Sequence, residues 1–369
     1  MSDGFLAQAT PALRALRAYD PGHDLPSLRA ARAPGALIEL GSNENAWGPS
    51  PQALAAIAKA DPSEVWRYPD PRGLALRERL ATLHGVALDE IVLGNGSHEL
   101  LMQLAQIFCA AGDELLHAEY GFAVYPIAAR AVGAEPVAAA AQTVGSAMPR
   151  GLDLAAMAAR VSPRTRLVCI ANPNNPTGTW VGLDDLAEFL AGLPSTLPVV
   201  IDEAYIEFAD APGLGSALAL RARFPNLVVT RTFSKAYGLA GLRVGYAIAD
   251  RQIVALIDRL RESFNVNALA LLSARAALDD PGHLAQVVGQ TRAEREWLRA
   301  ELIGRGYPVA PSQGNFLLVE FGAEAARIEQ RLLGRGVVLR PMQGYGLPQC
   351  LRVTVATRAE NQALLEALT

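Results

Sequence analysis

Lysine is rare in this chain of 369 residues, and one of its lysines stands where a ligand would bind. Only Lys59 and Lys235 are lysines among 33 basic residues, so a reaction that needs a deprotonable amine has two candidates. Lys59 ends an alanine-rich helical pattern, where a cation interacts favourably with the helix dipole. Lys235 follows an apolar run typical of a strand, at the end where parallel strands bind ligands. Because a guanidinium cannot form a Schiff base, this amine is a candidate nucleophile; an exposed loop lysine is the alternative.

A glycine-rich turn, Gly94-Asn95-Gly96-Ser97, joins a predicted strand to a predicted helix. Free amides and the positive end of the helix dipole at such a turn favour an anion. The dinucleotide fingerprint would need a third glycine where Glu99 stands, so a single phosphate is favoured over a dinucleotide. A tight turn without a ligand is the alternative.

Three more polar residues belong to apolar runs. Asp202 directly follows the run 198–201, where it is either a ligand of a buried group or the cap of the next helix. Arg340 and Arg352 lie within apolar runs near the carboxy terminus, and a buried arginine requires an anion or a partner carboxylate. Internal salt bridges are the alternative for both.

Together these groups are the parts needed to bind pyridoxal 5′-phosphate. A lysine forms the Schiff base, an amide cradle holds the phosphate, and a carboxylate keeps the pyridine nitrogen protonated. Arginine binds a substrate carboxylate through two parallel hydrogen bonds.

The elements that must position these residues fall into two patterns. Apolar runs alternate with helical patterns from about residue 46 to 278, which is typical of βαβ units and a mostly parallel sheet. We therefore predict an α/β fold with a large cofactor-binding domain at 46–278, a small α+β domain at 279–369, and an N-terminal segment, 1–45, packing on the small domain. A helix is predicted at 99–110, and strands at 91–93, 114–117, 167–170, 198–201, 227–230, 244–247, 315–319, 336–339 and 351–355.

Composition excludes several other classes of protein. An apolar fraction of 51% excludes a disordered chain, and a net charge of −4 without a basic block argues against nucleic acid or an anionic membrane as partner. The three cysteines are widely spaced and no apolar run approaches the ~20 residues of a membrane span, so we expect a reduced, cytoplasmic protein. The five histidines show no metal-ligand spacing, and no metal is expected.

From about Leu16 to its end the chain resembles the fold-type I pyridoxal-phosphate aminotransferases. The motifs that carry this resemblance occur in family order and form a highly specific set: 42–45 (SNEN), 67–70 (RYPD), 94–97 (GNGS), 174–178 (NNPTG), 202–205 (DEAY), 233–245 (FSKAYGLAGLRVG), 264–267 (FNVN) and 340–348 (RPMQGYGLP).

The resemblance implies roles for residues around the cofactor ring. Lys235 would form the Schiff base and, once released by substrate, move the proton between substrate Cα and cofactor C4′. Asp202 would pair with the pyridinium, while Asn175 and Tyr205 would hydrogen-bond the 3′-oxygen. Tyr120 would stack on the ring.

The resemblance also implies a phosphate site shared between two subunits. Ser234, Arg243 and the amides of Ser97 and His98 would hold the phosphate. Tyr68 would reach that phosphate across a subunit boundary, so a homodimer is expected. His98 replaces the acidic residue usual at its position, which alters the side chain of the cradle but not its amides.

The resemblance implies small-molecule substrates: a phosphorylated amino alcohol and the glutamate/2-oxoglutarate pair. Arg352 would bind the α-carboxylate, Arg340 and Tyr19 would bind the substrate phosphate, and Asn43 is a further candidate substrate contact. Ala46 replaces a usual proline, so the backbone after Asn43 is expected to be less rigid. Two alternatives remain open: a related enzyme on this scaffold, above all an aromatic amino acid aminotransferase, and a non-catalytic protein that binds the cofactor or a phosphate.

Overall fold

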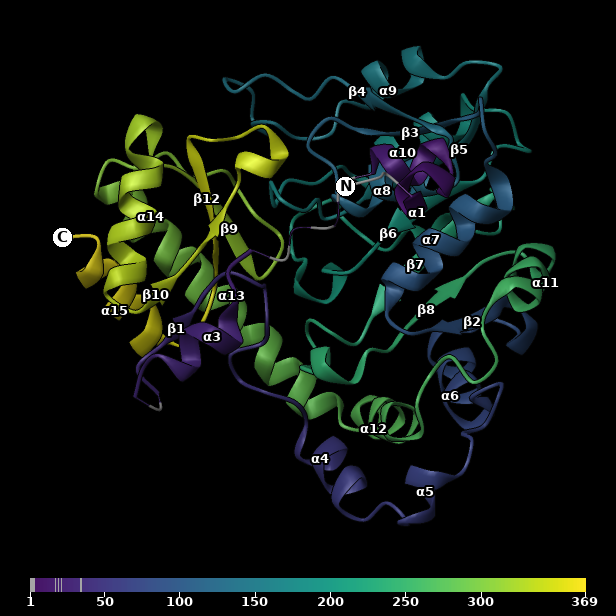
Figure 1. Cartoon of the computed structure of the whole chain (residues 1–369), viewed down its shortest axis with the longest axis horizontal. Coiled ribbons are helices and arrows are strands. Elements are labelled where there is room, and N and C mark those ends of the chain that lie inside the picture. Colours follow the sequence, from purple (N-terminus) through teal and green to yellow (C-terminus); the bar gives the residue numbers. More distant parts are fainter. Residues whose placement is uncertain (1–3, 17, 19, 21, 34) are drawn as a thin grey trace.

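The chain folds around a seven-stranded sheet and a smaller three-stranded sheet, shown on the right and left of Figure 1. The computed structural model describes residues 4–16, 18, 20, 22–33 and 35–369. In the large sheet the spatial order is β2 (Ile91–Gly94), β8 (Gly245–Ile248), β7 (Leu227–Thr232), β6 (Val199–Asp202), β5 (Thr165–Ala171), β3 (Glu114–Ala118) and β4 (Glu135–Ala139). The pairs from β7 through β4 are parallel, while β8 runs antiparallel to both of its neighbours. The mostly parallel sheet expected from the sequence is therefore confirmed.

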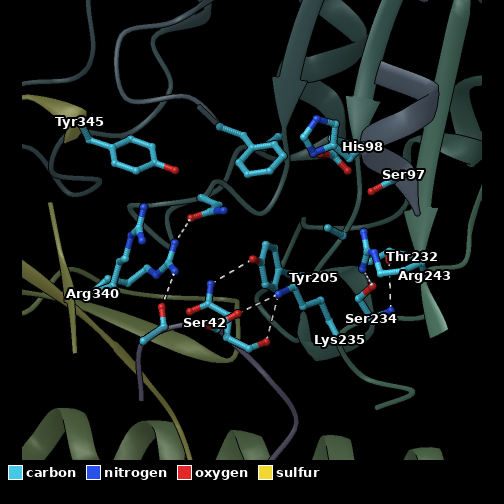
Figure 2. Close-up of a pocket in the computed structure, with 18 residues that line it drawn as sticks. Ser42, Ser97, His98, Tyr205, Thr232, Ser234, Lys235, Arg243, Arg340 and Tyr345 are labelled. Carbon is cyan, nitrogen blue, oxygen red and sulfur yellow. Dashed lines mark hydrogen bonds between the residues drawn. The ribbon is translucent and has the colours of Figure 1, made fainter. Parts of the chain in front are cut away.

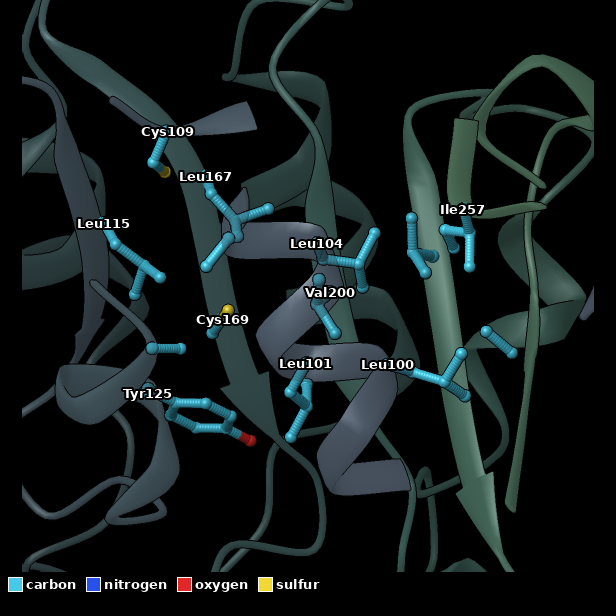
Figure 3. Close-up of a cluster of buried hydrophobic side chains, with 14 of the residues drawn as sticks. Leu100, Leu101, Leu104, Cys109, Leu115, Tyr125, Leu167, Cys169, Val200 and Ile257 are labelled. Carbon is cyan, nitrogen blue, oxygen red and sulfur yellow. The ribbon is translucent and has the colours of Figure 1, made fainter. Parts of the chain in front are cut away.

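Helices cover both faces of this sheet, because its strands are apolar on both sides. One face packs against α7 (Ser97–Phe108), α8 (Val124–Ala131) and α11 (Arg251–Leu260). Figure 3 shows Leu100, Leu101 and Leu104 of α7 lying against strand side chains such as Leu167 and Val200. The opposite face is covered by α9 (Leu154–Arg160), α10 (Leu183–Ala191), α4 (Pro51–Ala58), α6 (Leu74–His84) and α12 (Ala268–Leu278).

The smaller sheet is antiparallel, in the order β11 (Arg340–Pro341), β12 (Cys350–Thr354) and β9 (Phe316–Glu320). The long helix α13 (Pro281–Gly304) leads to it from α12, and α14 (Ala325–Gly334) and α15 (Arg358–Ala367) complete its apolar core (Figure 1). The strand predicted at 336–339 is shorter than expected and does not belong to the three-stranded sheet. β10 (Val337–Val338) pairs with β1 (Ile38–Glu39), and the chain then passes to β11 in the other sheet.

The N-terminal part of the chain contacts both halves of the molecule. Besides β1 it forms α1 (Gly4–Gln8), α2 (Pro11–Ala15) and α3 (Leu25–Ala30), and α5 (Ser63–Trp66) follows α4. α2 contacts α8 of the large sheet layer, whereas β1 lies beside β10. No helix within the described residues is long and apolar enough to span a membrane.

Candidate active site

Parallel strands β5, β6 and β7 end at the same edge of the large sheet, and a cavity of about 270 Å³ opens there. Their last residues, Ala171, Asp202 and Thr232, all line it. The N-terminus of α7 and the smaller sheet close its sides. Figure 2 shows the lining side chains converging on this space, which is bounded by Gly41, Ser42, Asn43, Ser97, His98, Phe122, Asn175, Ala204, Tyr205, Ser234, Lys235, Arg243, Arg340, Tyr345 and Arg352 in addition to the strand ends.

Lys235 lies in the loop after β7, and its amine points into the cavity (Figure 2). Nζ donates to the carbonyl oxygens of Ser42 at 3.1 Å and Asn43 at 3.2 Å. Burial, followed by the positive charge of Arg352, lowers the pKa of Lys235 to about 7. A large fraction of this amine is therefore unprotonated near neutral pH, as a nucleophile requires.

Asp202 is a buried carboxylate, 4% exposed, at the end of β6. Thr230 and Tyr125 donate hydrogen bonds to its two oxygens, at 3.0 and 3.3 Å. Burial raises the pKa of Asp202 to about 6, although these hydrogen bonds act in the opposite direction. No ion pair among the described residues includes Asp202, so its charge faces the cavity without a cationic partner. Asp202 does not cap an α-helix, because a turn and a short 3₁₀ helix, Ile206–Phe208, follow it.

The start of α7 and the Lys235 loop together form a cradle of hydrogen-bond donors. Gly96, in the left-handed region at φ 78°, precedes Ser97, and no side chain caps the helix. Arg243 Nη1 lies 3.4 Å from Ser234 Oγ beside this helix start. The positive φ favours glycine at this position, and a Cβ on Gly96 would lie 2.5 Å from Arg243 Nη2 and displace the end of that side chain. The cradle combines backbone amides at a helix start, a hydroxyl and a guanidinium, which is a donor set suited to a phosphate.

His98 also lines the cavity, next to the cradle. Burial and then the charge of Arg243 lower the pKa of its imidazole. At neutral pH this side chain is therefore neutral in the protein alone.

Arg340 and Arg352 lie directly opposite each other on β11 and β12, at the end of the cavity formed by the smaller sheet. Arg352 Nη1 donates to Asn175 Oδ1 at 2.7 Å, and Nη2 donates to the Gly41 carbonyl at 2.9 Å. Arg340 Nη2 donates to the carbonyl of Asp20, whose exposed carboxylate is 3.8 Å away. Arg340 Nη1 and Arg352 Nε are buried without a hydrogen-bond partner in the described part of the chain. Two adjacent cations with unsatisfied donors indicate a site for anionic groups.

Two of the expected residues that the structure describes, Tyr120 and Tyr68, are not part of the cavity lining. The side chain of Tyr120 packs against a small apolar cluster formed by Ala310, Leu318, Met342, Leu347 and Cys350. The chain turns at Gly121, whose amide donates to the Ala118 carbonyl, and this turn brings Phe122 into the cavity in place of Tyr120. Tyr68 is 82% exposed and stacks on Phe264, with ring centroids 4.4 Å apart.

A further expected residue, Tyr19, lies outside the described residues. The sequence prediction also missed Phe122, Tyr125 and Tyr345. The aromatic residues shortly after β3 were the available signal for Phe122, but their direction depends on the turn. Tyr125 lies one helical position inside α8, where nothing in the sequence points to Asp202.

Comparisons with known proteins agree with this geometry. A sequence model of the family described as aminotransferase class I and II matches residues 36–368. The chain belongs to this family. The expected α/β fold with its mostly parallel sheet is therefore confirmed as the fold of a family member.

Individual relatives of this aminotransferase match over nearly their whole length. It is 45% identical over 370 residues to a Pseudomonas fluorescens protein named histidinol-phosphate aminotransferase 2, covering 100% of this chain and 98% of that protein. A protein of the same name from Methylococcus capsulatus is 45% identical over 361 residues, covering 98% and 97%. The crystal structure of histidinol-phosphate aminotransferase from Sinorhizobium meliloti, in complex with pyridoxal-5′-phosphate, is similar with a TM-score of 0.87 and 30% identity, covering 98% of this chain and 96% of that one.

A more distant structure shows how far the fold extends. Aspartate aminotransferase from Thermus thermophilus, with maleate, superposes with a TM-score of 0.82 at 20% identity, covering 98% and 97% of the two chains. This likeness concerns the fold alone. No group of three or more histidine, cysteine or acidic residues that could hold a metal is present among the described residues.

Proposed function

We propose that this aminotransferase uses pyridoxal 5′-phosphate to exchange an amino group between L-histidinol phosphate and 2-oxoglutarate, giving imidazole acetol phosphate and L-glutamate in histidine biosynthesis. The observation that carries the proposal is the pair Arg340 and Arg352, whose unsatisfied buried nitrogens share one cavity with the Lys235 amine. Such a pair suits one substrate with a phosphate and another with two carboxylates. The names of the full-length relatives support the same substrate.

The residues present fit this cofactor. The cradle of Ser97, Ser234 and Arg243 offers donors for its phosphate, and Asp202 offers a buried anion for its ring nitrogen. Phe122 supplies an apolar ring in the same cavity. When bound, the cofactor supplies an aldehyde that couples to an amine and a ring that accepts electrons.

The chain's own residues then bind, orient and move protons. Lys235 Nζ, with its lowered pKa, both couples to the aldehyde and, once free, takes the proton from the substrate Cα. Arg352 holds Asn175 Oδ1, so the Asn175 Nδ2 hydrogens remain available for the 3′-oxygen of the ring. In this proposal Arg352 also binds the α-carboxylate of glutamate, and Arg340 binds the phosphate of histidinol phosphate.

We propose two domains around this cavity, 46–278 and 279–369, with boundaries as expected from the sequence. The segment 1–45 is expected from the sequence to pack on the smaller domain; its strand β1 does so, whereas α2 contacts α8 of the larger one. A separate apolar core supports the division, because the core of the smaller sheet layer is built from Leu40 and from residues between Leu298 and Leu368.

We further propose that the active unit is a cytoplasmic homodimer in which Tyr68 of the partner subunit reaches the cofactor phosphate. In its own chain Tyr68 is exposed next to exposed Val65 and Trp66, and these three side chains form an apolar surface suited to burial against a second copy. The three cysteines are free and buried, which suits a reducing compartment.

Mixing two inactive variants tests the shared site. Lys235→Ala and Tyr68→Ala chains should each be nearly inactive alone. After unfolding and refolding as a mixture, about a quarter of wild-type activity should return, because half of the dimers are mixed and each holds one intact site. Steady-state rates and size-exclusion profiles measure this. A mixture as inactive as its components would show that Tyr68 acts within its own chain or not at all.

An aromatic amino acid aminotransferase is the second candidate, since an aromatic substrate's carboxylate could also bind an arginine. The ratio of kcat/KM for histidinol phosphate to kcat/KM for phenylalanine distinguishes the two. We expect histidinol phosphate to be preferred, and Arg340→Gln to lower its kcat/KM by about 10²-fold or more while changing that for phenylalanine little, because a lost charged hydrogen bond costs about 3 kcal/mol. A wild-type enzyme that prefers phenylalanine or tyrosine would contradict the substrate assignment.

A single half-reaction tests the remaining alternative, a non-catalytic protein that binds the cofactor. Adding an amino donor to cofactor-loaded protein should convert the bound cofactor to its amine form, seen as loss of the visible absorption band. Binding without conversion would favour the non-catalytic alternative.

A further inference from the structure

Asn43 connects more of this cavity than its place in a loop suggests. Its amide N–H donates to Thr354 Oγ1 at 2.9 Å, and Thr354 Oγ1 lies 3.4 Å from Asn43 Oδ1 as a donor. Its Nδ2 donates to Tyr205 Oη at 3.0 Å. Its carbonyl oxygen accepts from Lys235 Nζ and from Asn315 Nδ2, at 3.2 and 3.1 Å. Asn43 is buried, with 1% of its surface exposed. Through these hydrogen bonds it connects the Lys235 amine to the Tyr205 hydroxyl.

The direction of the hydrogen bond between Asn43 and Tyr205 determines where the Tyr205 hydroxyl hydrogen can point. Because Asn43 Nδ2 donates to the phenol oxygen, that hydrogen occupies one acceptor direction and the Tyr205 hydroxyl hydrogen must point elsewhere. Among the described residues, the Tyr205 hydroxyl donates no hydrogen bond. Tyr205 lines the cavity, so its hydrogen is free to donate to a ligand there.

The backbone carbonyl of Asn43 accepts a hydrogen bond from the Lys235 amine. Asn43 has φ 54°, in the left-handed region, which asparagine adopts more readily than most residues. In this conformation the carbonyls of Ser42 and Asn43 both face Lys235 Nζ. These two acceptors can both hold the amine only while it is free, because coupling to an aldehyde removes two of its hydrogens and leaves at most one on the nitrogen.

We infer that Asn43 is a positioning residue: its side-chain amide sets Tyr205 as a hydrogen-bond donor to the 3′-oxygen of the cofactor, and its backbone holds the free Lys235 amine. The inference rests on the proposed cofactor and goes beyond a substrate contact for Asn43. A donor on the 3′-oxygen stabilises its anionic form, so it makes the neighbouring lysine-linked nitrogen easier to deprotonate.

Other charged groups act on the same atoms and must be held constant. Arg352 from β12, Arg243 from the loop before β8, Glu44 from the 42–45 segment and Asp202 from β6 face Lys235. Arg352, Asp202 and Tyr345 face Tyr205. None of these groups is changed in the test below.

The test is a pH titration of the visible absorption band of the cofactor-loaded protein. Asn43→Asp is nearly isosteric and tolerates the left-handed backbone, but its carboxylate accepts from Tyr205 and draws the hydroxyl hydrogen out of the cavity. We expect the midpoint of the titration to rise by about one pH unit or more, the shift expected for a lost hydrogen bond to a charged group. Asn43→Gly keeps the backbone conformation without reversing the bond, and its shift should be less than half as large.

A double-variant comparison separates bond direction from added charge. In a Tyr205→Phe background the Asn43→Asp shift should fall to less than a third of its size, since no hydroxyl remains to be turned. Equal shifts in both backgrounds would reduce Asn43→Asp to a charge effect and overturn the inference, as would no shift in either. A wild-type chain that takes up no cofactor would overturn the proposed function as well, whereas a normal wild-type titration with unchanged variants overturns this inference alone.

Discussion

Lys235→Ala should lose turnover by about 10⁴-fold or more, together with the visible absorption band of the bound cofactor. The variant removes the amine that couples to the cofactor and also the base that moves the substrate proton, so two functions disappear at once. Lys235→Arg should be equally inactive although it keeps the positive charge, because a guanidinium stays protonated at all accessible pH values. Absorption spectra and initial rates with histidinol phosphate and 2-oxoglutarate measure both effects.

The chain supplies a matched control, since it has only one other lysine. Lys59 is exposed at the C-terminal end of α4, away from the cavity lining. Lys59→Ala removes only a favourable interaction with the helix end, and its spectrum and rates should match those of the wild type. Undiminished transamination by Lys235→Ala would refute the assignment of the amine.

The parts of the site that follow strands could be predicted from the sequence, because each prediction needed only local information. Asp202 and Lys235 follow apolar runs that form β6 and β7, and parallel strands bring their ends to one edge. The glycine-rich turn before α7 was predictable for the same reason. The structure places all three around one cavity.

Contacts between distant segments could not be predicted in this way. Arg352 donates to Asn175 across 177 positions of sequence, and no local pattern contains that pairing. The position of Phe122 in the cavity depends on the turn at Gly121, and the direction of a side chain after a turn cannot be read from the apolar pattern. β4 is not among the strands predicted from the sequence. It contains Pro136, which disfavours most strands but is tolerated in an edge strand such as β4.

Asp202→Asn should change apo-protein stability and holoenzyme turnover in opposite directions. The pKa of Asp202 is raised from 3.8 to about 6 in the folded protein, so the folded state binds the proton more tightly than the unfolded chain. Ionisation of Asp202 therefore opposes folding, at a free-energy cost that grows from about pH 4 to pH 6 and then stays constant at about 3 kcal/mol. The neutral asparagine has no such cost. The apo variant should unfold at a higher temperature than the wild type above pH 6, and the difference should vanish near pH 4.

Turnover should fall on the order of 10²- to 10³-fold in the same variant, because a buried cation at the cofactor ring would lose the anion that faces it. Thermal unfolding of the apo-proteins across pH and steady-state rates of the loaded proteins give the two measurements. A side chain that destabilises the empty protein while it is ionised is suited to a partner that brings positive charge, which is what a protonated ring nitrogen provides. An apo variant less stable than the wild type at pH 8, with turnover preserved, would show that Asp202 serves the fold through Thr230 and Tyr125 rather than the cofactor.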